Sequence, residues 1–415
     1  MVLNYIWISF FIVAFLVALL KTFMGDYEIF SLVVNSIFER AELGFKLSLG
    51  LTGIMALWLG VMRIGEKGGA INILSKIFAP LFNKLFPEIP RSSNAHGSII
   101  MNISANMLGL DNAATPLGLK AMNELQKHNP EKEKASNAQI LFLVLNTSGL
   151  TLIPTSIIAL RATAMAENSI TGNPTDIFIP ILIATYCSTI AGLIFVSIIQ
   201  RINLFHKTIL AYLLTATGLI GGLVCYLASH KEHIEIISNV LSGALIFGFI
   251  IGFILLGLKN KINIYEEFVE GAKDGFKVAI KIIPYLIAML CAIGAFTTSG
   301  AMEFIINGIE GFFNLFISDT RFVEGLPTAI MKPLSGAGAR GMMVESWGEN
   351  ASQINSFVGR LTSTLQGSTE TTFYVLAVYF GSVGIKNTRY AIVAGLFADF
   401  IGIIAAILVC YLFFG

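Results

Sequence analysis

Side chains that could bind a polar molecule lie inside apolar segments at two places in this chain. They are Asn146, Thr147 and Ser148 in the first half and Gln366, Ser368, Thr369, Glu370 and Thr371 in the second half. Amide and hydroxyl groups can recognise the edges of a polar organic ligand. The hydroxyls could instead only bond to neighbouring helices. The free-energy cost of an unsatisfied amide or carboxyl group in lipid favours binding for Asn146, Gln366 and Glu370.

Charged side chains in the same apolar surroundings suggest ion coupling. Glu370 is the first coupling candidate, because a carboxyl group inside a membrane could exchange a proton or help to hold a cation. Asp399, in the last apolar run, is the second candidate, although it could also pair with a neighbouring helix. Asp111 and Arg340 are expected to form a charge pair that neutralises both groups.

Two further apolar segments are interrupted by Gly, Pro and polar residues. They read LGLDNAATPLG (108–118) and KPLSGAGARGMM (332–343). Irregular backbone survives in a membrane only where it meets protein, water or a ligand. Small residues let the backbone approach a ligand closely, and N–H groups at helix starts can bind anionic or carbonyl oxygens. The residues expected to contribute here are Asn112, Ser335, Gly336 and Gly338.

The composition is that of a membrane protein. Hydrophobic residues make up 55% of the 415 positions and charged residues 13%, against about 25% charged residues in soluble domains. The net charge of +1 gives no reason to expect nucleic acid as a partner. The scattered Cys and His residues predict neither a metal site nor a disulfide framework, and we expect no cofactor. Without a nucleophile–base pair or a metal-ligand set, an enzyme is not expected.

The apolar runs are long enough for a multi-pass protein. Runs that could cross a bilayer are roughly 4–23, 44–62, 137–160, 177–199, 209–228, 236–258, 276–298, 361–382 and 389–413. The first run lacks a basic start and a cleavage site, so we interpret it as a retained span.

The same order of features occurs twice. AELGFK (41–46) corresponds to AKDGFK (272–277), then the interrupted segments follow, and LNTSGLT (145–151) corresponds to LQGSTET (365–371). We therefore expect two repeats, each with a re-entrant hairpin and a span with a polar centre. The predicted division is 1–199 for the first repeat, 200–235 for a connecting transmembrane helix and 236–415 for the second repeat.

The distribution of Lys and Arg predicts how the repeats are oriented. Basic residues flank the first interrupted segment on both sides, in 63–91 and 120–134, whereas acidic residues flank the second. Since Lys and Arg concentrate in cytoplasmic loops, the hairpins should enter from opposite faces and the repeats should be inverted. This arrangement places the N-terminus in the cytoplasm and the C-terminus outside. The fold class is then an all-α polytopic membrane protein with two inverted-topology repeats.

Long motifs resemble two families of spore maturation proteins. NAATPLGLKAM (112–122) and NTSGLTLIPT (146–155) resemble spore maturation protein A. EGAKDGFKVAIKIIPYL (270–286), KPLSGAGARGM (332–342) and FVGRLTSTLQGSTETTFYVLAVYFGSVGIKNTRYA (357–391) resemble spore maturation protein B. The resemblance covers nearly the whole chain and implies a fusion of the two, within the nucleoside-recognition (Gate) superfamily. Asp111 and Arg340 depart from the family pattern, which has small or apolar residues there.

The resemblance and the interrupted segments together favour transport. Inverted repeats with broken helices at the midplane are typical of secondary transporters, so we expect alternating access at a site between the repeats for a small polar metabolite, with a nucleoside-like molecule as one possibility. The alternatives are a membrane scaffold for spore or envelope maturation and a lipid-carrier flippase. A scaffold predicts no cavity between the hairpin tips, whereas a flippase predicts a lateral opening and basic residues. The expected location is the bacterial cytoplasmic membrane, with lipid and a small molecule as partners and a homo-oligomer left open.

Overall fold

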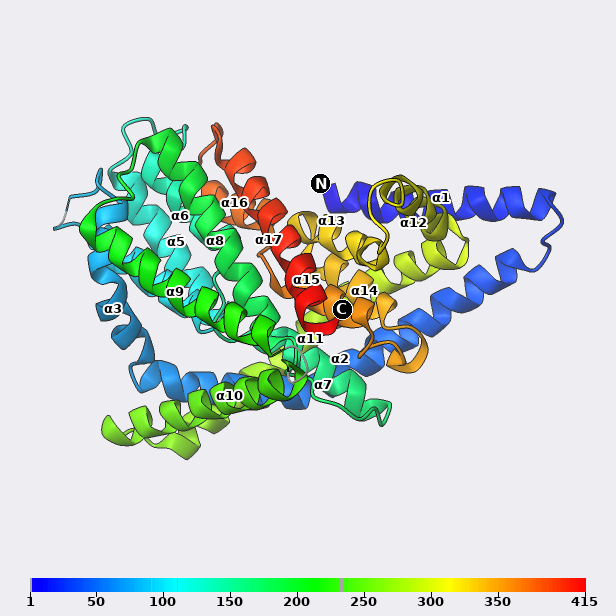
Figure 1. Cartoon of the computed structure of the whole chain (residues 1–415), viewed down its shortest axis with the longest axis horizontal. Coiled ribbons are helices and arrows are strands. Elements are labelled where there is room, and N and C mark those ends of the chain that lie inside the picture. Colours follow the sequence, from blue (N-terminus) through cyan, green and yellow to red (C-terminus); the bar gives the residue numbers. More distant parts are fainter. Residues whose placement is uncertain (1, 91, 110, 231–233) are drawn as a thin grey trace.

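Helices make up the regular structure of the described chain. The computed structural model describes residues 2–90, 92–109, 111–230 and 234–415 (Figure 1). Within these ranges every element is a helix, and only an isolated bridge joins Lys134 to Asn387. In the described part of the chain, six helices are long and apolar enough to cross a membrane, or seven if a bent pair forms one span. The prediction of an all-α polytopic membrane protein is confirmed.

The order of helices recurs in the two halves. The first half contains α1 (Val2–Phe23), α2 (Ile29–Lys67), α3 (Ala70–Leu85), α4 (Asn94–Met107), α5 (Asp111–Lys127), α6 (Asn137–Thr147), α7 (Thr155–Glu167) and α8 (Phe178–Gln200). The second half contains α10 (Ile234–Lys259), α11 (Ile264–Thr298), α12 (Ala301–Phe313), α13 (Leu326–Leu334), α14 (Gly336–Ser346), α15 (Phe357–Gly367), α16 (Thr372–Ser382) and α17 (Ala391–Phe414). Between them lies α9 (Lys207–Ser229), which has no counterpart. The predicted domain boundaries at 199 and 235 stay a prediction.

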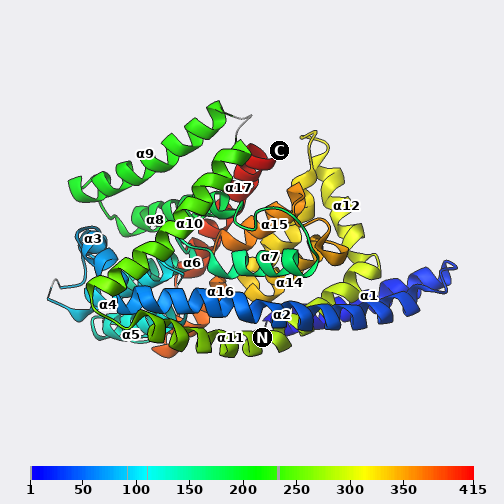
Figure 2. The same ribbon diagram turned by 90° about the horizontal axis from the view of Figure 1, so that it is seen from below.

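Corresponding helices of the two halves pack against each other in antiparallel pairs. In the pair of α2 and α11, Gly44 lies against Ile287 and Ala56 against Gly275, so residue numbers rise along one helix as they fall along the other (Figure 2). In the pair of α8 and α17, Ser188 donates a hydrogen bond to the Ala398 carbonyl oxygen. Antiparallel contact between equivalent helices is the relation that inverted repeats require. The inverted-repeat arrangement and its orientation in the membrane stay predictions.

The two polar-centred runs are broken helices. The runs 137–160 and 361–382 were expected to be continuous spans, but each consists of two short helices. The first break (148–154) contains Gly149, in the left-handed region with φ +51°, and Pro154, which precedes α7. The breaks meet, because the Glu370 N–H donates to the Thr147 carbonyl oxygen over 2.8 Å. This hydrogen bond satisfies one N–H group and one carbonyl oxygen that the breaks leave without a partner in their own helices.

The broken spans run between two pairs of loops. We call 128–136 with 383–390 loop face 1, and 168–177 with 349–356 loop face 2. Backbone hydrogen bonds hold loop face 1, including one of 2.8 Å from the Lys386 N–H to the Glu133 carbonyl oxygen. At loop face 2, Asn355 donates to the Thr171 carbonyl oxygen over 3.0 Å. The first broken span starts at loop face 1 and the second at loop face 2, so the two are antiparallel.

Buried charges bind loop face 2 to both broken spans. Arg161 on α7 and Arg360 on α15 pair with opposite oxygens of Asp176, over 3.0 and 2.7 Å. Arg161 is fully buried and also donates to the Ile354 carbonyl oxygen over 2.9 Å. Separating the two halves would leave these charges buried without a partner, which is costly in free energy. We therefore infer that the network fixes the two halves relative to each other.

The interrupted segments form two hairpins that open toward different loop faces. The hairpin of α4 and α5 has its outer ends at loop face 1, where Gln126 donates to the Val383 carbonyl oxygen. The hairpin of α13 and α14 adjoins loop face 2, where the Gln353 N–H donates to the carbonyl oxygen of Trp347, just after α14, over 2.7 Å. Each tip is attached to the break of its own half. Leu152 N–H donates to the Met107 carbonyl oxygen, and Gln366 donates to that of Gly336.

Candidate functional site

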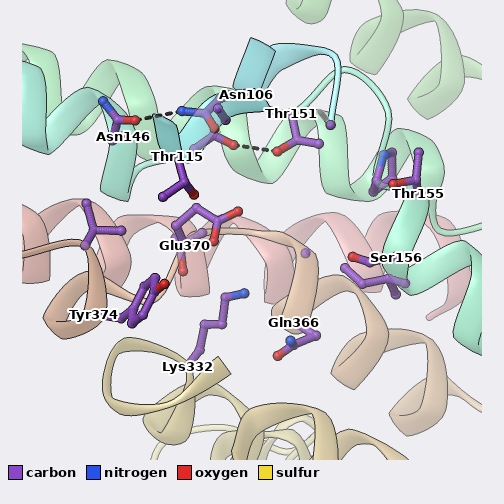
Figure 3. Close-up of a pocket in the computed structure, with 18 of the residues that line it drawn as sticks. Asn106, Thr115, Asn146, Thr151, Thr155, Ser156, Lys332, Gln366, Glu370 and Tyr374 are labelled. Carbon is purple, nitrogen blue, oxygen red and sulfur yellow. Dashed lines mark hydrogen bonds between the residues drawn. The ribbon is translucent and has the colours of Figure 1, made fainter. Parts of the chain in front are cut away.

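A polar cavity of about 440 Å³ lies where the two hairpins and the two breaks meet. Figure 3 shows its side chains converging from elements of both halves. Its polar and charged lining residues are Asn106, Thr115, Asn146, Thr151, Thr155, Ser156, Lys332, Arg340, Gln366, Thr369, Glu370, Tyr374 and Tyr379. The cavity therefore offers amides, hydroxyls and charges of both signs to one ligand.

The structure brings together some of the residues singled out in the sequence. Asn146, Gln366, Thr369, Glu370 and Arg340 line the cavity. The predicted residues outside its lining are Thr147, Ser148, Ser335, Gly336, Gly338, Ser368, Thr371 and Asp399. The side chains of Asp111 and Asn112 lie outside the described part of the chain, and so does the predicted Asp111–Arg340 pair.

Four of the five predicted hydroxyls outside the lining bond within their own half-helix or cap the next one, whereas Thr371 stands at the N-cap of α16 without a side-chain capping bond. Thr147 donates to the Val144 carbonyl oxygen and Ser368 to that of Leu365. The Ser335 hydroxyl caps α14 by accepting from the Gly338 N–H over 3.0 Å. These contacts satisfy the helix ends at a break, which is the structural alternative to ligand binding.

Asn146 is held at both ends of its amide. Its Nδ2 donates to the Phe142 carbonyl oxygen over 2.8 Å, and its Oδ1 accepts from Asn106 Nδ2 over 2.7 Å. The Tyr379 hydroxyl, from the other half, donates to the same Oδ1 over 3.3 Å. Because three elements fix this amide, it forms a rigid wall of the cavity in one orientation.

Gln366 has hydrogen-bonding capacity left over. Its side chain is 2% exposed, and Nε2 donates to the Gly336 carbonyl oxygen over 3.3 Å. Its Oε1 is buried and accepts no hydrogen bond from the described residues. A buried amide oxygen without a hydrogen bond costs free energy. A ligand that offers a hydrogen-bond donor to this side chain from the cavity would remove that cost.

The charged groups of the cavity, Glu370, Lys332 and Arg340, come from the second break and the second hairpin. Glu370 is exposed to the cavity, whereas Lys332 on α13 is 7% exposed (Figure 3). Asp399 lies outside the cavity lining and is 1% exposed. Its Oδ2 accepts from the Thr372 hydroxyl over 2.6 Å, while Oδ1 has no hydrogen-bond donor among the described residues. The two coupling candidates therefore occupy different environments, one open to the cavity and one behind it.

Several lining residues were not selected from the sequence. They include Asn106, Thr115, Thr155, Ser156, Lys332, Tyr374 and Tyr379. One signal could have found Asn106, because Asn102 and Asn106 are one turn apart in an otherwise apolar stretch. Tyr379 carries no local signal, since it lies in a run that is otherwise typical of a span. Among the described residues, no group of three or more His, Cys, Asp and Glu could hold a metal ion.

Comparison with known proteins gives a family match in each half. The Gate model, described as nucleoside recognition, matches residues 48–164 and again residues 279–386, together more than half of the chain. Spore maturation protein A of Bacillus subtilis is 41% identical over 191 residues, 46% of this chain and 92% of that protein. Spore maturation protein B of the same organism is 45% identical over 182 residues, 43% of this chain and 98% of that protein. These matches are those expected of a fusion of two such proteins.

Proposed function

The chain belongs to the nucleoside recognition (Gate) family, and on this premise we propose that it is a transporter of a small polar, nucleoside-like molecule. The substrate would bind in the polar cavity between the two halves. The observation that carries the proposal is a polar cavity built from both breaks and both hairpins, with Gln366, whose buried Oε1 is unpaired among the described residues, in its lining. A volume of about 440 Å³ falls in the range of pockets that bury small organic ligands.

The chemistry of the lining suits a nucleoside-like molecule. An amide such as Gln366 can pair with the donor and acceptor edges of a base. Tyr374 offers an aromatic ring at the cavity, on which a planar base could stack. The hydroxyls of Thr151, Thr155 and Ser156 could bond to those of a sugar.

The arrangement of the hairpins suits alternating access. Each hairpin adjoins one loop face and carries its tip to the cavity, so movement of one hairpin would open the cavity toward its own face. We propose that loop face 1 is cytoplasmic, as its basic residues suggest, in the cytoplasmic membrane of a bacterium. The N-terminus would then be cytoplasmic and the C-terminus outside.

The polar cavity also helps to distinguish the proposed transporter from a scaffold and from a flippase. A scaffold without transport predicts no cavity between the hairpin tips, so the cavity argues against it. A lipid-carrier flippase is the second candidate, because two basic residues, Lys332 and Arg340, line the cavity. The flippase would move a fluorescent lipid analogue between leaflets of proteoliposomes, whereas the nucleoside transporter would not.

Binding to the purified chain tests the proposal. We expect at least one of the common ribonucleosides to raise the thermal unfolding temperature and to enter proteoliposomes. Gln366→Ala should abolish both effects, because it removes the amide offered to the ligand. Gln353→Ala is the matched control, since Gln353 is exposed at loop face 2. No stabilisation by any nucleoside, or equal stabilisation of the Gln366→Ala variant, would refute the proposed substrate class.

A further inference from the structure

A second cavity, almost wholly apolar, lies beside the polar one. It measures about 540 Å³, is partly open to the surface and is lined by residues of α3, α4, α6, α8 and α9. Its walls include Phe78, Phe82, Leu193, Ala216 and Leu219. Asn106 lines both cavities, so the two adjoin at the tip of the first hairpin.

The apolar cavity exists because α9 stands away from α8. Tyr212 on α9 donates to the Ile77 carbonyl oxygen, and Tyr186 on α8 shares a 2.6 Å hydrogen bond with Thr217. Figure 2 shows α9 apart from the other helices along much of its length. Only 6% of the apolar stretch of α9 is buried inside the protein. As a candidate span, α9 must therefore turn most of its surface toward lipid.

In the other half, α12 packs against a hydrophobic core cluster. There Ile306, Ile309 and Phe313 of α12 pack against a core cluster that contains Ala405 and Ala406 of α17. Among the described residues, the apolar cavity lies in the half next to the additional helix, and α9 supplies one of its walls.

We propose that this cavity binds one acyl chain of a phospholipid from the surrounding bilayer, with the end of the chain beside Asn106. Water is a poor occupant, because the walls offer few polar partners. A protein helix is too wide, at about 10 Å with side chains, for a space of this volume. A hydrocarbon chain matches the walls in both width and polarity, and it restores the dispersion contacts that an empty cavity loses.

A bound chain would act on the polar cavity through one hydrogen bond. Asn106 donates to Asn146 Oδ1 over 2.7 Å, and Met107, the next residue, lines the apolar cavity. The chain would thus support the tip of the first hairpin from behind. Whether an acyl chain occupies the apolar cavity depends on the surrounding lipid and not on transport. The inference therefore extends beyond the proposed function.

Photolabelling tests the inference. The full chain is reconstituted in phosphatidylcholine that carries a diazirine at the end of one acyl chain, irradiated and mapped by peptide mass spectrometry. We expect strong labelling of residues at the inner end of the cavity, such as Met107 and Leu145. Ala216→Trp should reduce this labelling at least several-fold, because the indole fills the cavity.

Two further variants make the outcome decisive. Leu214→Trp adds an indole to an exposed position of the same helix and should leave the inner labelling unchanged. Ala216→Phe, a smaller change, should give an intermediate reduction at an unchanged unfolding temperature, which excludes misfolding as the cause. Absent inner labelling in the original chain, or equal labelling in the Ala216 variants, would show that the cavity is closed or filled otherwise. Neither result depends on whether nucleosides are transported.

Discussion

At the residue scale, Glu370 and Asp399 are both carboxyl groups near the second break, but only Glu370 faces the polar cavity. If Glu370 exchanges the coupling proton, Glu370→Gln should keep the fold and remove the pH dependence of the transport rate. Its backbone N–H would still donate to Thr147, so the break should survive. Asp399→Asn is the comparison, and it should retain the pH dependence. A pH-dependent Glu370→Gln variant together with a pH-independent Asp399→Asn variant would reassign the coupling role to Asp399.

At the element scale, the first hairpin depends on a glycine at its tip. Gly109 has φ +70°, and a Cβ there would lie 2.6 Å from the Ile153 carbonyl oxygen. Gly109→Ala should therefore cost more than the roughly 1–2 kcal/mol of the left-handed conformation alone. Gly97→Ala in α4 is the control, because its Cβ would meet nothing within 4 Å, and it should stabilise by about 0.5–1 kcal/mol. Thermal unfolding in detergent measures both, and equal effects would contradict the tight contact at the tip.

At the scale of the whole molecule, inverted repeats predict that the two loop faces lie on opposite sides of the membrane. With the four native cysteines replaced, we expect Lys127→Cys and Asn350→Cys to react with a membrane-impermeant maleimide from opposite sides of sealed vesicles. Lys127 ends α5 near loop face 1, and Asn350 belongs to loop face 2. Both positions are exposed. Labelling of both from the same side would exclude inverted repeats.

The sequence by itself determined the class of the protein and the places where its helices are irregular. Apolar runs, interrupted segments and the repeated order are local properties of the chain, so hydropathy and Gly or Pro content suffice to find them. Polar groups inside apolar runs pointed to Asn146, Gln366, Thr369 and Glu370, which line the cavity. Bilayer physics makes such groups costly wherever they occur, which is why they are visible without a structure.

Only the tertiary structure decided which polar groups face the cavity and where the spans break. Thr369 lines the cavity, whereas its neighbour Ser368 bonds back to Leu365, and composition does not distinguish them. The break at Glu370 is stabilised by the Thr147 carbonyl oxygen, from the other half of the chain. Tyr379 meets Asn146 because the two broken spans pack together antiparallel, and Asn106 reaches the same amide from the first hairpin. Such contacts depend on how segments that are distant in the sequence pack together, and the residue pattern of one segment does not predict that packing.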